Sequence, residues 1–288
     1  MAQCGDDPTD RPCDRGQWTT DHGPTMNIIV CVKQVPDTAT KVRIGKDGRH
    51  IDPEGVKFIV NTYDDFAVEE AIRLKERFGG EVTVISMGPE RVKEALRMCL
   101  AMGADKAIQL WDPAFEDSDP YTTALILSKA IQQLPYDLIF CGKQAIDRDT
   151  TSVPSYLAEM LRLPQATVVV KLEVDPVAKK FIAYRDIEGA KEVLEGPLPA
   201  VISTQWKLNE PRYPTLPNIM KAKKKELKEL NAGALGLDPT MVGEKGSRVR
   251  VLGMELPPPR SKGKILKGDP KEVARELVRL LREEAKVI

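Results

Sequence analysis

The sequence predicts an α/β fold, a three-layer sandwich in which helices cover both faces of a parallel sheet. Short apolar runs alternate with amphipathic helical stretches from Met26 to about residue 162, and this alternation is typical of parallel sheets covered on both faces. Hydrophobic residues make up 42% of the chain, which is enough for one sizeable core. After Pro164 two strand-like runs flank a turn, and this predicts a β-hairpin extension.

Each element of the first half is predicted from its hydrophobic period. Strands are expected at 27–33, 81–88, 106–111 and 136–142. The intervening helices are recognised by one apolar face each, formed by Ala67, Ala71, Leu74 and Phe78, then by Val92, Ala95, Leu96 and Cys99, then by Ala124, Leu127, Ile131 and Leu134. A fourth helix carries Val153, Leu157 and Leu161, and Gly79-Gly80 ends the first helix.

The second half is expected to add strands and then to leave the sheet. Strands are predicted at 165–175, 179–186, 191–195 and 199–205, with a turn at Pro176. Residues 208–268 are rich in proline, lysine and glycine and predict an extended arm, while Asp269-Pro270 predicts the start of a terminal helix. We therefore expect a disordered extension at 1–25, a nucleotide-binding domain at 26–207, and a loop, arm and C-terminal helix at 208–288.

Composition limits the functions open to this chain. Basic and acidic side chains both number 43, so no net charge attracts nucleic acid or a membrane surface. No apolar run reaches the roughly 20 residues that span a bilayer. The five cysteines form no CxxC pair, and only two histidines are present, so we predict a cytoplasmic protein without a metal site or a histidine-based catalytic centre.

A nucleotide site is predicted at the carboxyl ends of the strands, where open parallel sheets bind ligands. Thr150, Thr151 and Ser152 would place hydroxyl and N–H groups at a helix N-terminus, which suits a phosphate, although threonine and serine are also ordinary helix caps. The sequence contains no GxxxxGK[ST] loop and no GxGxxG after the first strand. That weakens an interpretation as a kinase, an ATPase or a nicotinamide-dependent dehydrogenase.

Five separated blocks of this sequence resemble the electron transfer flavoprotein β subunit. They are CVKQVPDT (31–38), NTYDDFAVEEAIRLKE (61–76), LAMGADKA (100–107), CGKQAIDRDT (141–150) and YRDIEGAKEVLEGPLPAVIST (184–204). The resemblance implies a Rossmann-like sandwich of the adenine nucleotide alpha hydrolase-like type. It also implies an electron carrier and not an enzyme, paired with an α subunit that shares its FAD, and working between an acyl-CoA or similar dehydrogenase and a quinone oxidoreductase.

The resemblance also implies which residues bind nucleotide. An adenine nucleotide would contact Cys31, Asn61, Met87, Gly142, Thr150, Thr151, Ser152 and Val153, and Tyr63 would lie near the flavin of the α subunit. KQVPDT at 33–38 resembles relatives that hold a second FAD and bifurcate electrons, whereas PRYPTLPNIMKAKKK at 211–225 resembles carriers that hold AMP. We favour AMP and keep a second FAD as the alternative.

A docking segment is predicted around Leu216, which stands between Pro214 and Pro217. The two prolines predict a stiff, extended loop with an apolar tip, and an ordered tip loses less entropy on binding. The resemblance implies a recognition loop with contacts from Tyr213, Leu216, Pro217, Ile219 and Met220. On physics alone this leucine could instead fold back onto its own domain. An alternative of another class is a stress-type module that binds AMP or ATP, which would leave this loop without a purpose.

Overall fold

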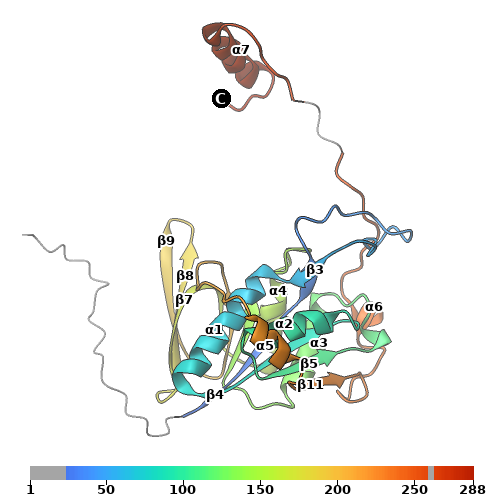
Figure 1. The fold of residues 1–288 in the computed structure, drawn as a ribbon, viewed down its shortest axis with the longest axis vertical. Helices are drawn as coiled ribbons and strands as arrows, with labels where there is room; N and C mark the ends of the chain where they lie inside the picture. Colours follow the sequence, from blue (N-terminus) through green and yellow to red (C-terminus); the bar gives the residue numbers. More distant parts are fainter. Residues whose placement is uncertain (1–23, 259–262) are drawn as a thin grey trace, which may run out of the picture. The chain divides into compact units, whose positions relative to one another are not determined.

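In a computed structural model that describes residues 24–258 and 263–288, one mixed sheet forms the centre of the fold (Figure 1). Its strands are β1 (Met26–Cys31), β4 (Gly80–Met87), β5 (Lys106–Leu110), β6 (Leu138–Gly142), β7 (Gln165–Asp175), β8 (Lys180–Ile187), β9 (Ala190–Pro197), β10 (Ala200–Thr204) and β11 (Leu227–Leu230). The order is β11-β5-β4-β1-β6-β10-β7-β8-β9. Neighbours from β11 to β7 pair parallel, whereas β8 and β9 pair antiparallel. The predicted parallel sheet with a β-hairpin is therefore confirmed.

Helices cover both faces of this sheet, as the hydrophobic periods predict (Figure 1). The longer helices beside the sheet are α1 (Thr62–Phe78), α2 (Val92–Met102), α3 (Pro120–Ile131) and α4 (Ser152–Leu161). Alternate residues of β1 enter different cores: Ile28 and Val30 pack with α1 and α2, whereas Ile29 and Cys31 pack with α3 and α4. This alternation follows from the two-residue period of a strand and produces the three layers.

The stretch predicted as an extended arm contains regular structure, so that prediction is wrong for much of 208–251. Helix α5 (Leu216–Ala222) packs beside α2, strand β11 pairs with β5, and the short helix α6 (Gly243–Gly246) follows. Ala222 and Leu230 are buried. The predicted extended loop around Leu216 also ends earlier than expected, since Leu216 is the first residue of a helix. Pro217 fits there because the first helical turn has no intrahelical partner for its N–H.

Three further short elements are absent from the sequence prediction. Strands β2 (Gln34–Pro36) and β3 (Phe58–Val60) form a separate antiparallel pair directly after β1 and before α1. The 3₁₀ helix η1 (Pro113–Phe115) follows β5 and is capped by the side chain of Asp112. The β2–β3 pair matters for the site, because it fixes the chain that leaves β1 at its carboxyl end.

The described residues divide into two compact units, of which the first, 24–42 with 53–251, contains the sheet. The second unit comprises 43–52, 252–258 and 263–288. It contains a bridge between Ile44 and Ile51 and helix α7 (Pro270–Glu283). The side chain of Asp269 accepts a hydrogen bond from the Lys271 N–H, so the predicted cap and terminal helix are confirmed.

None of the helices in 24–258 and 263–288 has the length and hydropathy needed to cross a membrane. The disordered extension predicted at 1–25 falls outside the described residues, apart from its last two positions.

A buried ion pair ties the segment before α5 to helix α1. The Arg212 guanidinium lies 2.8 Å from a carboxylate oxygen of Glu69 and 2.6 Å from one of Glu76. Glu69 is only 2% exposed and also pairs with Arg73 at 2.7 Å. Burial alone would raise the pKa of Glu69, but hydrogen bonds from Arg212 and Arg73 hold that pKa below its usual value. Asn209 adds a hydrogen bond to the Phe66 carbonyl.

Replacing Arg212 by alanine is expected to lower the free energy of unfolding by about 1–3 kcal/mol, because Glu69 keeps only one of its two cations in a buried place. Arg212→Lys should recover part of this, since lysine keeps the charge but not the paired donors. Urea unfolding at pH 7 measures both. An Arg212→Ala midpoint equal to that of the exposed ion-pair control Lys180→Ala would contradict the buried-pair assignment.

Candidate functional site

The carboxyl ends of β1, β4 and β6 lie side by side, as the candidate site requires. Cys31, which ends β1, is in register with Ile85 on β4 and with Cys141 on β6. Gly142, which ends β6, is in register with Thr204, which ends β10. Met87 ends β4 beside Leu110 of β5. Three of the predicted nucleotide-binding residues, Cys31, Met87 and Gly142, are therefore brought to one edge of the sheet.

Asp64, in the first turn of α1, binds three segments at this edge of the sheet: the chain after β1, the end of β6 and the residue before α1. Its carboxylate accepts hydrogen bonds from the N–H of Lys33 at 2.7 Å, the N–H of Gly142 at 3.1 Å and the side-chain amide of Asn61 at 2.9 Å. A Cβ at position 142 would overlap this carboxylate. The close approach of β6 to Asp64 explains why glycine ends that strand. Asp64 fixes where β1 and β6 end relative to α1.

Asn61 shapes the loop that follows β6. Its amide donates to Asp64 and, at 2.9 Å, to the carbonyl of Gln144, while its carbonyl oxygen accepts from the N–H of Ile146 at 3.1 Å. The side chain is 1% exposed. These bonds use both ends of the amide inside the protein. Asn61 therefore acts on this site by holding residues 144–146 in place.

Burial shifts the pKa values of two neighbouring carboxyl groups at this edge. Burial raises the pKa of Asp64 to about 7, against the opposing effect of its three hydrogen bonds. It also raises the pKa of Asp65 to about 7, and for Asp65 burial is the only cause. A charged carboxylate loses hydration when it is buried, so both groups favour the protonated form more than they would in water. A negative charge on either carboxyl group at the start of α1 therefore lowers the stability of the fold at neutral pH.

The Asp65 shift gives a pH-dependent prediction. Its folded pKa of about 7 lies above the ordinary 3.8, so its contribution to stability is complete below pH 3.8 and is lost as pH rises through 7. Asp65→Asn should therefore gain stability over the natural chain between pH 6 and 8, by about 1–3 kcal/mol at pH 8, with little difference near pH 4. Thermal unfolding at pH 4 to 8 measures this. A difference that does not change with pH would contradict the burial argument.

The loop 142–152 leads to a helix N-terminus with free hydroxyl groups. Thr151 is the N-cap of α4, but its side chain makes no capping hydrogen bond. Within the described ranges, the hydroxyls of Thr150, Thr151 and Ser152 have no hydrogen-bond partner. Thr150 and Thr151 are exposed, and Ser152 and Val153 are half-buried. Thr151 therefore does not act as an ordinary side-chain cap of α4. The hydroxyl and N–H groups at this N-terminus, which carries partial positive charge, remain available as hydrogen-bond donors.

The loop is held to the chain leaving β1 by an ion pair. The ammonium of Lys33 lies 2.6 Å from the carboxylate of Asp147, and Gln144 donates to the side chain of Asp149 at 2.7 Å. Asp149 has a φ of 50°, in the left-handed region that asparagine and aspartate tolerate better than most residues. These contacts turn the backbone so that Thr150 and Thr151 follow directly at the helix start.

The remaining predicted residues line the base of this edge. Cys31 is 7% exposed and Cys141 is 4% exposed. Hydrogen bonding to the Cys31 thiol and burial both raise the pKa of the Cys141 thiol. Met87 is half-buried in the core beside α3. Tyr63 is half-buried, its carbonyl accepts from the Thr204 hydroxyl at 2.9 Å, and the Lys143 ammonium lies 5.9 Å from its ring centroid.

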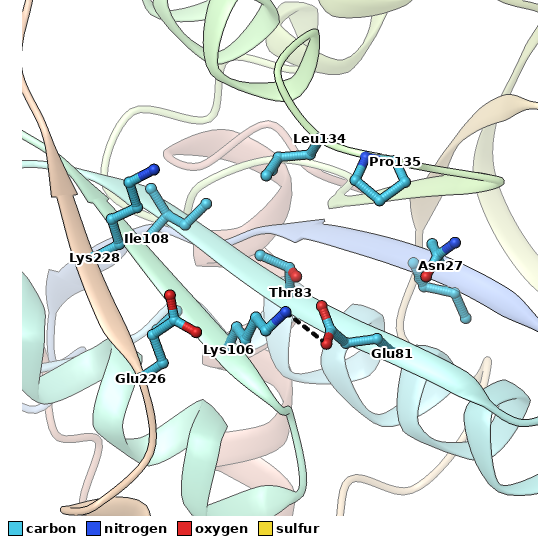
Figure 2. Close-up of a pocket in the computed structure, with 11 residues that line it drawn as sticks. Asn27, Glu81, Thr83, Lys106, Ile108, Leu134, Pro135, Glu226 and Lys228 are labelled. Atoms are coloured by element: carbon cyan, nitrogen blue, oxygen red, sulfur yellow. Dashed lines mark ion pairs between the residues drawn. The ribbon is translucent and has the colours of Figure 1, made fainter. Parts of the chain in front are cut away.

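A pocket of about 180 Å³ lies at the opposite, amino edge of the sheet (Figure 2). It opens near the first residues of β1, β4 and β5, where Asn27, Glu81 and Lys106 contribute to its lining. Figure 2 shows Leu134 and Pro135 on one side of it and the ion pair between Lys106 and Glu81, 2.8 Å long, on the strands. The sequence predicted no site at this edge. None of the predicted nucleotide-binding residues lines this pocket.

The predicted docking residues lie on and before α5. Tyr213 is 94% exposed and Leu216 is 75% exposed. Ile219 and Met220 are also exposed, on the same short helix. A leucine folded back onto its own domain, the alternative left open by the sequence, is excluded by this exposure. Large apolar side chains grouped on a surface are typical of protein interaction sites.

Comparisons with known proteins show which family this chain resembles. The model of the electron transfer flavoprotein domain family matches residues 49–235. The chain is 46% identical over 257 residues to the electron transfer flavoprotein subunit beta of Thermoanaerobacterium thermosaccharolyticum, covering 89% of this chain and 98% of that protein. It is 41% identical over 264 residues to the subunit beta of Bacillus subtilis, covering 91% and 100%. Protein FixA of Azotobacter vinelandii is 41% identical over 259 residues, covering 86% and 92%.

Proposed function

Because this chain belongs to the electron transfer flavoprotein β-subunit family, we propose that it is one half of a heterodimeric electron carrier in the cytoplasm. Its companion is an α subunit, and together they take electrons from an acyl-CoA or similar flavin dehydrogenase and pass them towards a quinone oxidoreductase. The observation that carries this proposal is the exposed apolar segment Tyr213–Met220, held to α1 by Arg212. An ordered apolar surface of this kind suits a transient protein partner.

The carboxyl edge of the sheet holds a structural AMP in this proposal. Thr150, Thr151, Ser152 and the N–H of Val153 bind its phosphate at the start of α4, where these hydroxyls have no protein partner among the described residues. Cys31 and Met87 offer an apolar wall for the adenine ring. Gly142 has no side chain, so the backbone that leads into the loop can pass close to Asp64. Asn61 and Asp64 position the loop that carries the phosphate-binding groups.

The redox cofactor of the carrier is an FAD shared with the α subunit. When bound, the flavin supplies the electron storage that no side chain of this protein provides. Tyr63, half-buried at the start of α1, is our candidate for the aromatic side chain of this chain that faces the flavin. The task of this chain is then to support the flavin domain and to present the docking segment.

A second candidate is a bifurcating carrier, in which the β subunit holds a second FAD and the complex oxidises NADH. The segment KQVPDT at 33–38 favours it, since Lys33 pairs with Asp147 and so brings this segment against the 142–152 loop. A stress-type module that binds AMP or ATP is less favoured, because it gives no use to the exposed residues of α5.

Co-expression with the α subunit tests the proposal. A yellow heterodimer with one FAD, releasing AMP on acid treatment, is expected. Two FAD per heterodimer would select the bifurcating form. If the chain is purified from the co-expression as a colourless protein that does not bind the α subunit, the proposal is wrong. Thr151→Ala with Ser152→Ala should lower the AMP content without lowering the FAD content. The matched control is Ser155→Ala with Thr240→Ala, of which Ser155 is half-buried further along α4 and Thr240 is exposed.

Leu216→Ala is expected to raise the KM for the carrier about 10-fold or more in assays with a reduced acyl-CoA dehydrogenase. Truncating an exposed leucine that a partner buries removes roughly 1.5–3 kcal/mol of binding, while the fold loses little because the side chain is already 75% exposed. Steady-state kinetics measure the change in KM, and the flavin absorbance shows whether the heterodimer stays folded with its cofactor. An unaltered KM would remove the docking role of Leu216.

A further inference from the structure

A groove of about 410 Å³ lies between α2 and α5, next to the docking segment. The residues that line it are Glu94, Arg97, Met98, Ala101, Ile219 and Lys223. Ala101 is 2% exposed, whereas Met98 on one wall is 44% exposed and Ile219 on the other is 36% exposed. A groove with these side chains is apolar inside, and its size falls in the range of sites that hold small ligands or large side chains.

Two basic residues keep the groove in shape. The guanidinium of Arg97 donates to the carbonyls of Ala222 and Lys225, at 2.7 and 2.8 Å, and so fastens the end of α5 to α2. The ammonium of Lys225 donates to the Leu100 carbonyl at 3.0 Å and to the Ala104 carbonyl. The walls are therefore fixed before any partner arrives, which lowers the entropic cost of filling the groove.

The groove continues the apolar surface that carries Leu216. Leu216, Ile219, Met220 and Lys223 are spaced i, i+3, i+4 and i+7, so they lie along one side of α5 and its C-terminal extension. This spacing is typical of helices that bind a partner through one face. A protein that covers Leu216 is thereby brought against the opening of the groove.

The charges around the groove indicate what kind of surface fits it. Lys221, Lys223 and Lys224 are exposed, and in the ranges 24–258 and 263–288 none of their side-chain ammonium groups has an ion-pair or hydrogen-bond partner. Of the described residues that line the groove, Glu94 is the single one with a carboxylate. Exposed charges of one sign at the rim of an interface favour a partner of the opposite sign and accelerate its association.

We propose that this groove receives an apolar side chain from an acidic surface of the same flavin dehydrogenase that binds Leu216. This proposal rests on the proposed function and adds a second contact to it. In the first contact Leu216 inserts into the dehydrogenase, and in the second a side chain of the dehydrogenase inserts into the groove. Two contacts on adjacent helices fix the direction in which the dehydrogenase approaches, whereas a single leucine would leave it free to rotate. The rim lysines then pair with carboxylates around the incoming side chain.

Substitution of Met98 tests the groove without touching the helix that carries Leu216. The holo heterodimer is titrated into an acyl-CoA dehydrogenase reduced by its substrate, and KM and kcat for the carrier are measured. Met98→Glu is expected to raise KM about 10-fold with kcat and flavin content unchanged, because it puts a carboxylate against an acidic, apolar surface. Met98→Lys should raise KM less than Met98→Glu, and Met98→Leu should leave KM within about twofold. Val193→Glu, on β9 and 56% exposed, is the matched control.

The outcomes separate this proposal from the proposed function. If the natural heterodimer accepts no electrons from the dehydrogenase, the proposed function fails. If it accepts them and Leu216→Ala raises KM while Met98→Glu does not, the groove alone is rejected. If Met98→Lys is more harmful than Met98→Glu, the acidic partner surface is rejected. Replacing Lys221, Lys223 and Lys224 by glutamine should also flatten the dependence of KM on salt, and an unchanged dependence would count against the charge argument.

Discussion

Ending the chain after Gly268 is expected to abolish the heterodimer with the α subunit. The deletion removes α7, whose apolar residues Val273, Leu277, Leu280 and Leu281 lie on one face, and no residue of this helix is buried. An amphipathic helix with an uncovered apolar face gains most of its stability by packing against another surface. We predict that this surface belongs to the α subunit.

The helix is prepared for such a partner by its own contacts. Asp269 caps its first turn, and Arg279 pairs with Glu276 and Glu283, each at 2.7–2.8 Å. These pairs are exposed to solvent, which screens them, so they stabilise the helix only slightly. They leave the helix formed but without a core of its own, so burial of its leucines must come from outside the helix.

A single substitution separates this role from general disorder of the end of the chain. Leu277→Asp is expected to weaken binding of the α subunit by about 100-fold, since it removes an apolar contact and buries a charge. Arg275→Asp, on the opposite face of α7, should weaken binding less than about threefold. Size-exclusion chromatography and titration of the separated subunits measure both. Equal effects of the two variants would contradict an interface along the apolar face.

Helix α5 and strand β11 show where sequence reasoning fails. The central strands were predictable because apolar β-branched runs occupy both faces of a covered sheet. Strand β11 has only Leu227 and Leu230 as apolar residues, and charged neighbours surround them. Its place is decided by pairing with β5, which lies more than 100 residues earlier in the sequence. Pro214 and Pro217 concealed α5, although a proline in the first helical turn is compatible with a helix.

The candidate site was predictable in position but not in detail. The rule that ligands bind beyond the carboxyl ends of strands groups Cys31, Met87 and Gly142, and the structure places these three residues at one edge of the sheet. The contacts of Asn61 and Asp64 with residues 142–146 could not be predicted, because that segment lies about 80 residues away. Asp64 has the position of an ordinary acidic residue in the first turn of a helix, which gives no sign of these contacts. One signal was available: a glycine at the end of a buried strand indicates close approach of another group.

Asp64→Ala is expected to lower the free energy of unfolding by about 3–5 kcal/mol and to abolish the proposed binding of a nucleotide. The alanine leaves the N–H groups of Lys33 and Gly142 and the amide of Asn61 without an acceptor, and buried donors cost roughly 1–3 kcal/mol each. Once these bonds are lost, the ends of β1 and β6 are no longer held at one distance from α1, and the loop proposed to bind the phosphate loses its support.

Graded variants distinguish the hydrogen-bond role from simple loss of charge. Asp64→Asn keeps one acceptor oxygen but turns an NH₂ group towards a backbone N–H, so its effect should lie between those of the natural chain and Asp64→Ala. Gly142→Ala should resemble Asp64→Ala, because its Cβ overlaps the same carboxylate. Asp65→Asn removes a neighbouring carboxyl that makes no such bonds, so nucleotide content should stay unchanged. Urea unfolding of the heterodimer and acid release of nucleotide measure both effects. If Asp64→Ala matched Asp65→Asn in both measurements, the three hydrogen bonds would not be what organises this edge of the sheet.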